Sequence, residues 1–302
     1  MSRIATVPLQ NILSGSIQRA QQNLAVSQAQ LASGKKATNV ADLGVDSVRT
    51  LSSRALMSRQ QAYVMASDRV SATMALYNTH LSGIETSSGD LRRSLLEAIG
   101  TGRSGGIQEQ IESSFAQLKT SLNASEGGVP LFAGSQTEDI PFTPNALSDL
   151  IPAPPANAFT NDKVRPAARL SDGLDITYGV VADEVATGLV TAFTTLANAG
   201  PFGDTLTAAQ LTAVTNAIDQ LDGGLKTVRE MSAENGRKQA QIETFGTRAN
   251  ERATLLQTIV GKVEDADLGQ VAIDISVQKT TLEASLTVFS QLSKLSLVNY
   301  LN

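Results

Sequence analysis

Both ends of the chain carry apolar residues at the spacing of paired helices. Near the N-terminus, Leu13, Ile17, Ala20, Leu24 and Leu31 follow one another at intervals of three, four or seven residues. Near the C-terminus, the residues Leu268, Ile275, Leu282 and Phe289 are seven apart, with Val271, Leu286 and Leu292 beside them. Such stripes predict helices that pack against other helices. Because each stripe is narrow and polar residues surround it, neither helix is expected to be stable until the other terminus or a neighbouring copy covers it.

The composition favours long helices over a large compact core. Hydrophobic residues make up 41% of the 302 residues, but aromatic residues only 4%, and Trp is absent. The net charge is −5, divided into +5 over residues 1–60 and −10 over the remainder. These charges are spread along helices, so we interpret them as solvated and expect no nucleic-acid partner.

Cysteine usage and hydropathy exclude several classes. With no Cys in the chain, disulfides, thiol catalysis and cysteine metal sites are excluded. The first residues, MSRIATVPLQ, contain one cation and no apolar run of signal-peptide length, so classical secretion is not expected. No segment approaches 18 consecutive apolar residues, and we therefore expect no membrane insertion.

Glycine and proline divide the chain into helices and one insertion. A first helix is expected from about Pro8 to Ala32, ended by Ser33-Gly34, and a long one over 45–99. A shorter helix is expected over 107–125, and helical periodicity returns at Leu206, with a break at 261–269. The pair Gly223-Gly224 is expected to kink the last long helix.

The centre of the sequence has a different character. Seven of the nine prolines lie between Pro130 and Pro166, which excludes helix interiors there. Leu174, Ile176 and Tyr178 alternate with other residues after Asp172-Gly173, a hairpin signal. We predict a mostly α fold: an elongated antiparallel helical rod with paired terminal helices and a small β-containing insertion. Its expected domains are a terminal paired-helix domain (1–44 with 262–302), a rod (45–134 with 201–261) and an outer insertion (135–200).

The chain lacks the residue patterns of an enzyme. His80 is the only histidine, and no ligand cluster or Gly-x-Ser-x-Gly elbow accompanies it. One acidic cluster, formed by Glu264, Asp265 and Asp267, lacks the spacing of a calcium-binding loop. We interpret it as the start of a helix, where acidic groups favour the helix dipole. We therefore expect no catalytic residue, no cofactor and no metal.

Two segments near opposite ends of the chain, residues 30–36 (QLASGKK) and residues 263–268 (VEDADL), carry a resemblance to a known family. The first is similar to the "SSG-K/R-R" segment after the first helix of the flagellin superfamily, and the second to its "IEDAD" segment. The chain resembles this superfamily over nearly its whole length, and both ends match best. The acid pair that usually follows the N-terminal loop is reduced to Asp42 here. Residues 131–137, LFAGSQT, and the tail 295–301, LSLVNYL, are similar to the group of this family that joins the flagellar hook to the filament.

The resemblance implies a structural role with no enzymatic activity. It implies an extracellular subunit of the bacterial flagellum, exported unfolded without a cleaved signal, whose ends fold when copies stack in a ring. The implied partners are other copies, the preceding hook-associated protein and flagellin, with an export chaperone on the C-terminal helix. The expected assembly interface consists of Ile17, Leu24, Leu31, Leu268, Ile275, Leu282, Phe289 and Leu292.

Two other functions stay open from the sequence. The first is filament flagellin, a polymerising subunit of the same family. The second is a tip or translocator protein of a type III secretion system, with coiled-coil arms.

Overall fold

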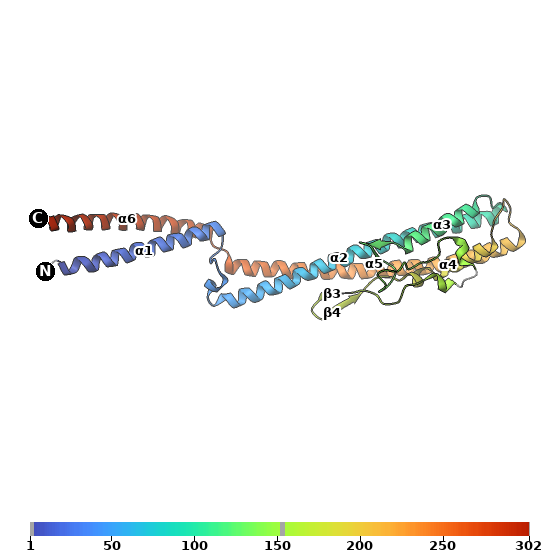
Figure 1. Cartoon of the computed structure of the whole chain (residues 1–302), viewed down its shortest axis with the longest axis horizontal. Helices are drawn as coiled ribbons and strands as arrows, with labels where there is room; N and C mark the ends of the chain where they lie inside the picture. The colour runs from blue at the N-terminus through green and yellow to red at the C-terminus, as the bar shows by residue number, and fades with distance from the viewer. Residues whose placement is uncertain (1–2, 152–154, 302) are drawn as a thin grey trace. The chain divides into compact units, whose positions relative to one another are not determined.

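A computed structural model describes residues 3–151 and 155–301, with side chains described over 11–151 and 155–291. The helices are α1 (Arg3–Ser33), α2 (Asp46–Thr101), α3 (Ile107–Leu122), α4 (Ala182–Ala199), α5 (Ala208–Glu264) and α6 (Leu268–Leu301), shown in Figure 1. The short 3₁₀ helices are η1 (Val40–Leu43), η2 (Leu147–Leu150) and η3 (Pro155–Ala158). The strands are β1 (Ser125–Glu126), β2 (Val129–Pro130), β3 (Ala167–Ser171) and β4 (Leu174–Thr177). The prediction of a mostly α fold with a small β-containing part is confirmed.

The chain forms two compact units. Unit 1 contains residues up to Arg59 and from Arg252 onward, and unit 2 contains Gln60–Glu251. These two units do not test the division into three domains that is expected from the sequence, and that division stays a prediction. None of the helices in the described part of the chain combines the length and hydrophobicity that crossing a bilayer would need.

In unit 1, α1 and α6 pair along their length. Figure 1 shows the two helices side by side with the chain ends at the same end of the pair, so they are antiparallel. The predicted helix break near 261–269 is confirmed, because α5 ends at Glu264 and α6 begins at Leu268.

In unit 2, α2 and α5 are also antiparallel neighbours. Asn235 of α5 donates its Nδ2 hydrogens to the carbonyl oxygen of Met74 at 2.9 Å and to Oδ1 of Asn78 at 2.8 Å, both on α2. Further along, Arg229 pairs with Glu85 at 2.6 Å. The partner numbers rise on one helix as they fall on the other, which defines the antiparallel register.

The main core of unit 2 lies where α3 and α4 join the two long helices. Its largest fully buried side chains include Phe132, Phe142 and Phe193. Phe115 packs against both Phe142 and Phe193, with ring centroids 5.8 and 5.5 Å apart. The few aromatic residues of the chain are therefore concentrated where a globular core exists.

The β-containing part rests on the long helices through a second, smaller core. Strands β3 and β4 form an antiparallel hairpin in which Ala168 is level with Ile176. The hairpin buries Leu170 and Ile176 with Val70, Met74 and Ile242 of α2 and α5. The hairpin expected after Asp172-Gly173 is thus present, closed by a turn in which Gly173 has a positive φ of 74°.

The segment 131–134, LFAG, begins the insertion as a buried turn. Leu131, Phe132 and Ala133 are buried, and the Tyr77 hydroxyl donates to the Leu131 carbonyl oxygen. Gly134 has φ 72°, and a Cβ there would lie 2.2 Å from Oδ1 of Asp162, so only glycine fits. Asp162 accepts from the backbone N–H groups of Ser135 and Val164 at 2.9 Å each. Hydrogen bonds from the Ser135 side chain and from these backbone groups lower the pKa of Asp162 below its usual range.

The helix α5 continues without a break through Gly223 and Gly224, and the kink expected there stays a prediction. Gly224 is the point where α4 crosses α5. A Cβ on Gly224 would lie 2.6 Å from Cδ2 of Leu189 and 2.9 Å from its backbone nitrogen, and one on Gly188 would lie 3.1 Å from Cα of Gly224. Two glycines therefore let the helix backbones approach, which is a tertiary requirement and not a helix break.

Substitution of the two adjacent glycines separates these roles. Gly224→Ala forces α4 away from α5 and should lower the free energy of unfolding by about 1–3 kcal/mol. Gly223→Ala is the matched control, since nothing lies within 4 Å of its Cβ position. It should raise stability by up to about 1 kcal/mol through helix propensity. Urea unfolding followed by circular dichroism measures both, and equal effects would contradict the proposed helix crossing.

Candidate assembly site

The contact between α1 and α6 is a seam of residues spaced alternately three and four apart. On α1 the seam positions Leu13, Ile17, Ala20, Leu24 and Ser27 are buried or half-buried. On α6 the seam positions Val271, Ile275, Gln278, Leu282, Ser285 and Phe289 are buried or half-buried. This alternation is the a/d pattern of a coiled coil, so the helices pack along one narrow face each.

The seam is interrupted by a polar layer. Ser27 is only 4% exposed, and its hydroxyl donates to Oε1 of Gln278 at 3.3 Å. Small residues, Ala20 and Ser285, occupy other seam positions. Polar and small layers bury less apolar surface than leucine layers, so the pair gains little stability from its own seam.

The structure places five of the eight sequence-predicted interface residues in this seam. Ile17, Leu24, Ile275, Leu282 and Phe289 are half-buried there. Leu31 and Leu268 remain 48% and 49% exposed, near the end of the pair where the chain turns. Leu292 belongs to α6, but its side chain lies outside the described residues.

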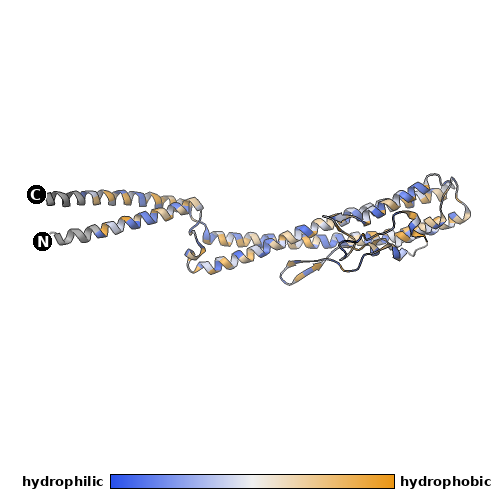
Figure 2. Ribbon diagram, in the orientation of Figure 1, coloured by the Kyte–Doolittle hydropathy of each residue, from blue (hydrophilic) through white to orange (hydrophobic). Residues whose placement is uncertain are grey.

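A second apolar face on α6 escaped the sequence analysis. Ile273, Val277 and Val288 are 58%, 59% and 45% exposed, and Ala284 is exposed between them. At about 100° of turn per residue, these four side chains project within roughly 60° of one another, on the side away from the seam. Figure 2 shows apolar residues recurring along α6. In the sequence, these four residues are separated by four, seven and four positions. The heptad repeat of the seam residues is the stronger pattern on the same helix, and it obscured this one. We call Ile273, Val277, Ala284 and Val288 the outer face of α6.

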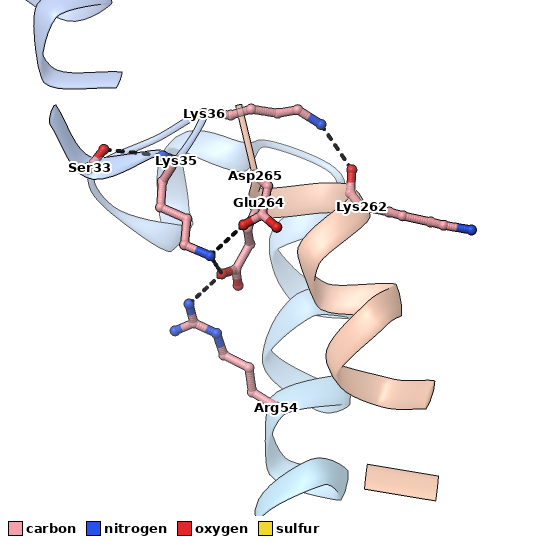
Figure 3. Close-up of polar contacts among 7 residues, drawn as sticks. All are labelled: Ser33, Lys35, Lys36, Arg54, Lys262, Glu264 and Asp265. Carbon is pink, nitrogen blue, oxygen red and sulfur yellow. Dashed lines mark hydrogen bonds and ion pairs between the residues drawn. The ribbon is translucent and has the colours of Figure 1, made fainter. Parts of the chain in front are cut away.

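The base of the helix pair is closed by a backbone clamp. Lys36 donates its N–H to the Glu264 carbonyl oxygen at 2.7 Å, and Ala266 donates to that of Gly34 at 2.9 Å. Lys35 and Asp265 therefore form an antiparallel β-bridge between the end of α1 and the α5–α6 break. Both segments that resemble the flagellin superfamily meet in this clamp, shown in Figure 3.

Charged side chains reinforce the clamp. Glu264 is 4% exposed, and its Oε2 accepts from Arg54 at 2.7 Å and lies 3.6 Å from Nζ of Lys35. Lys35 also pairs with Asp265 at 2.6 Å (Figure 3). This hydrogen bond raises the pKa of Lys35, so the ammonium is charged at neutral pH and its contribution is lost only in alkaline solution.

The second lysine of the motif caps a helix. Nζ of Lys36 donates to the Lys262 carbonyl oxygen at 3.0 Å, in the last turn of α5 (Figure 3). Carbonyls in that position lack intrahelical partners, and a cation there also favours the helix dipole. The adjacent lysines therefore have separate roles, one as an ion-pair partner and one as a C-terminal cap.

Metal chemistry has no evident place in the described residues. Among them, no group of three or more His, Cys, Asp or Glu side chains is arranged to hold a metal ion. His80 is partly buried, and its ring lies 6.4 Å from that of Phe132. Burial lowers the pKa of His80, so it contributes a neutral packing surface.

Comparison with known proteins supports the architecture. No protein-family model matches the sequence, and no curated protein sequence matches it. A structure assigned as a flagellar hook-associated protein of Vibrio parahaemolyticus is similar, with a TM-score of 0.63 at 15% identity. The match covers 74% of this chain and 100% of that one. The chain has the fold of the flagellar hook-associated proteins. FlgL of Bacillus cereus is also similar, with a TM-score of 0.56 at 18% identity, over 70% of this chain and 98% of that one.

Glu264, the buried acid of the clamp, should contribute more to stability than its exposed neighbour Asp265. Glu264→Gln removes the charge that Arg54 and Lys35 share, and should lower the free energy of unfolding of unit 1 by about 1–2 kcal/mol. Asp265→Asn is the control; because Asp265 and Lys35 are both exposed, it should cost less than about 1 kcal/mol. Urea unfolding followed by circular dichroism compares the two. A larger loss for Asp265→Asn would show that the surface pair holds the clamp.

Proposed function

We propose that the protein is a structural subunit of the bacterial flagellum that joins the hook region to the flagellin filament. Its fold, shared with flagellar hook-associated proteins, supports the flagellar role. The segments LFAGSQT (131–137) and LSLVNYL (295–301), which are similar to those of the junction group, favour the adaptor over a filament flagellin.

The observation that carries this proposal is the apolar character of α6 on two opposite faces. One face packs on α1, and the outer face is uncovered in the single chain. A helix that is apolar on both sides belongs in an interior. An isolated subunit has no interior at this position, so neighbouring copies are expected to supply it.

Assembly then supplies the stability that the seam lacks. Burying Ile273, Val277 and Val288 would contribute roughly 1–2 kcal/mol each. The terminal helices would thus be marginal in the free subunit and ordered in the ring, which keeps the subunit soluble until a neighbour arrives. The interface proposed from the sequence, including Leu31, Leu268 and Leu292, belongs to the same pair of helices.

The partners follow from the position of an adaptor. One side of a ring of copies would contact the preceding hook-associated protein, and the other side flagellin. The protein would be extracellular, exported unfolded through the flagellar secretion channel without a cleaved signal. An export chaperone would find its binding site on α6, the helix with the most uncovered apolar surface. No cofactor takes part in this function.

A charge placed in the seam should block assembly without unfolding the rest of the chain. Leu282→Asp puts a carboxylate between α1 and α6 and should abolish incorporation, while unit 2 keeps its helices. Ser276→Asp is the control, because Ser276 is exposed and lies on neither apolar face. Pelleting of assembled protein measures incorporation, and circular dichroism measures the helix content that unit 2 should keep. Normal assembly of Leu282→Asp would contradict the role of the seam.

The adaptor role is tested by concentrating the purified protein in ammonium sulfate and imaging it by electron microscopy. Short oligomers that join to added flagellin are the expected result, because a junction ring should not extend on itself. Long regular filaments of the protein alone would overturn the adaptor role in favour of a filament flagellin.

A further inference from the structure

Gly236 of unit 2 is a helix glycine that packing does not explain. It lies within α5, which runs unbroken from Ala208 to Glu264. Nothing lies within 4 Å of the position where a Cβ would stand on this residue. Because glycine inside a helix is destabilising relative to alanine, an alanine would fit here and strengthen the helix. The residue before it gives this glycine a chemical consequence.

Gly236 follows Asn235, and no other asparagine of the chain precedes a glycine. Asparagine is a labile residue, because the backbone nitrogen of the next residue can attack its side-chain amide carbon. Glycine makes this attack easiest, since it has no side chain to hinder the approach and leaves the backbone free to turn. The sequence therefore places its most reactive asparagine in the middle of a long helix.

The reaction needs only the chain, a base and water. The Gly236 nitrogen gives its proton to the base and forms a bond to Cγ of Asn235. The bond between Cγ and Nδ2 then breaks, and the nitrogen takes a proton from water and leaves as ammonia. Water opens the resulting cyclic imide. Attack at Cγ gives aspartate, and attack at the backbone carbonyl carbon gives isoaspartate, in which the main chain runs through the side chain.

The folded chain holds Asn235 away from this reaction. The residue is only 2% exposed. Its Nδ2, the nitrogen that would leave, donates to the carbonyl oxygen of Met74 at 2.9 Å and to Oδ1 of Asn78 at 2.8 Å. Within a helix, the N–H of Gly236 is bonded to the carbonyl oxygen four residues earlier, which fixes a backbone conformation unsuited to ring closure. Attack therefore requires α5 to open and its side chain to leave α2.

We propose that Asn235 is a deamidation site that the folded protein protects and that becomes reactive whenever this part of α5 unfolds. The rate in the native protein then follows the fraction of chains in which α5 is open. Because the reaction is irreversible, it records the time that a chain has spent unfolded. The site depends on the folding of unit 2 and not on the proposed function.

A chain that reacts while unfolded cannot rebuild the contact between α5 and α2. In the aspartate product, the oxygen that replaces Nδ2 faces two acceptors, the Met74 carbonyl oxygen and Oδ1 of Asn78. The other side-chain oxygen takes the place of Oδ1 of Asn235, which is buried and has no hydrogen-bond partner in the described part of the chain. The new carboxylate would therefore be buried without a donor, which is strongly destabilising.

The cations beside this position are engaged in other pairs. Arg165 and Lys238 line the same small crevice as Asn235, and they pair with Glu184 and Glu234. A carboxylate that forms here thus meets cations whose charge is already compensated. The isoaspartate product adds a backbone atom to α5 and interrupts its ladder of hydrogen bonds. Either product should keep α5 from regaining its place against α2.

Peptide mapping measures the reaction at individual asparagines. The full chain is kept at mildly alkaline pH, either folded or in guanidinium chloride, and is then digested with trypsin and analysed by mass spectrometry. Trypsin releases residues 230–237, EMSAENGR, in which Asn235 is the only asparagine. Asn78 is the internal control, since it belongs to the same contact but precedes a threonine.

In the denatured chain, Asn235 should deamidate several times faster than Asn78. In the folded chain, its deamidation should be at least about 100-fold slower than in denaturant, because only the rare open chains react. Gly236→Ala should slow the reaction in denaturant several-fold and leave the fold intact. Equal rates at Asn235 in the two states would overturn the protection by the fold. A rate in denaturant no higher than that of Asn78 would overturn the site itself.

The consequence for folding is tested on chains that are aged in denaturant and then diluted into buffer. Modified chains should be missing from the refolded fraction, in which unmodified chains are recovered. Asn235→Asp should lower the midpoint of urea unfolding, whereas Ala233→Asp, at an exposed position of the same helix, should leave it nearly unchanged. Recovery of modified chains in proportion to their abundance, or equal midpoints for the two variants, would overturn this consequence.

Discussion

The antiparallel seam between α1 and α6 is the contact on which the assembly account depends. It alternates half-buried leucine and isoleucine side chains with small residues and with the polar layer of Ser27 and Gln278. A polar layer in a coiled coil costs stability and fixes register. The seam therefore favours one alignment of the two ends without making the pair strongly stable, and α6 retains an uncovered apolar face for a neighbour.

The clamp determines where this pairing begins. Residues 33–36 bridge to 264–266 through backbone hydrogen bonds, and Glu264 is buried beneath Arg54 and Lys35. Two segments that lie 230 residues apart in the sequence are thus joined beside the seam. Holding them together there removes most of the entropy cost of bringing the terminal helices together. It also explains why the two most recognisable sequence segments lie far apart along the chain, since each supplies one side of the clamp.

Local patterns in the sequence predicted much of the fold, and tertiary contacts account for the rest. Short-range chemistry determines the helix breaks near Gly34 and Gly261 and the turn at Asp172-Gly173. These features could therefore be predicted directly from the local sequence. Gly224 could not, because its conformation is helical and its purpose is contact with Leu189 on another helix. Heptads identified Ile17, Leu24 and Leu282 as interior positions, but periodicity alone does not say whether the same chain or a second copy covers a face. The outer face of α6 became evident only after α1 was seen to cover the other side.

Hydrogen exchange of the terminal helices, compared between free subunit and assembly, tests the central claim most directly. The account predicts fast exchange over residues 11–33 and 268–291 in the free subunit, with the buried parts of α2 and α5 in unit 2 protected. In the assembled state, both terminal segments should become protected together. Equal and strong protection of α6 in the free subunit would contradict the account, because the seam alone would then suffice to fold it.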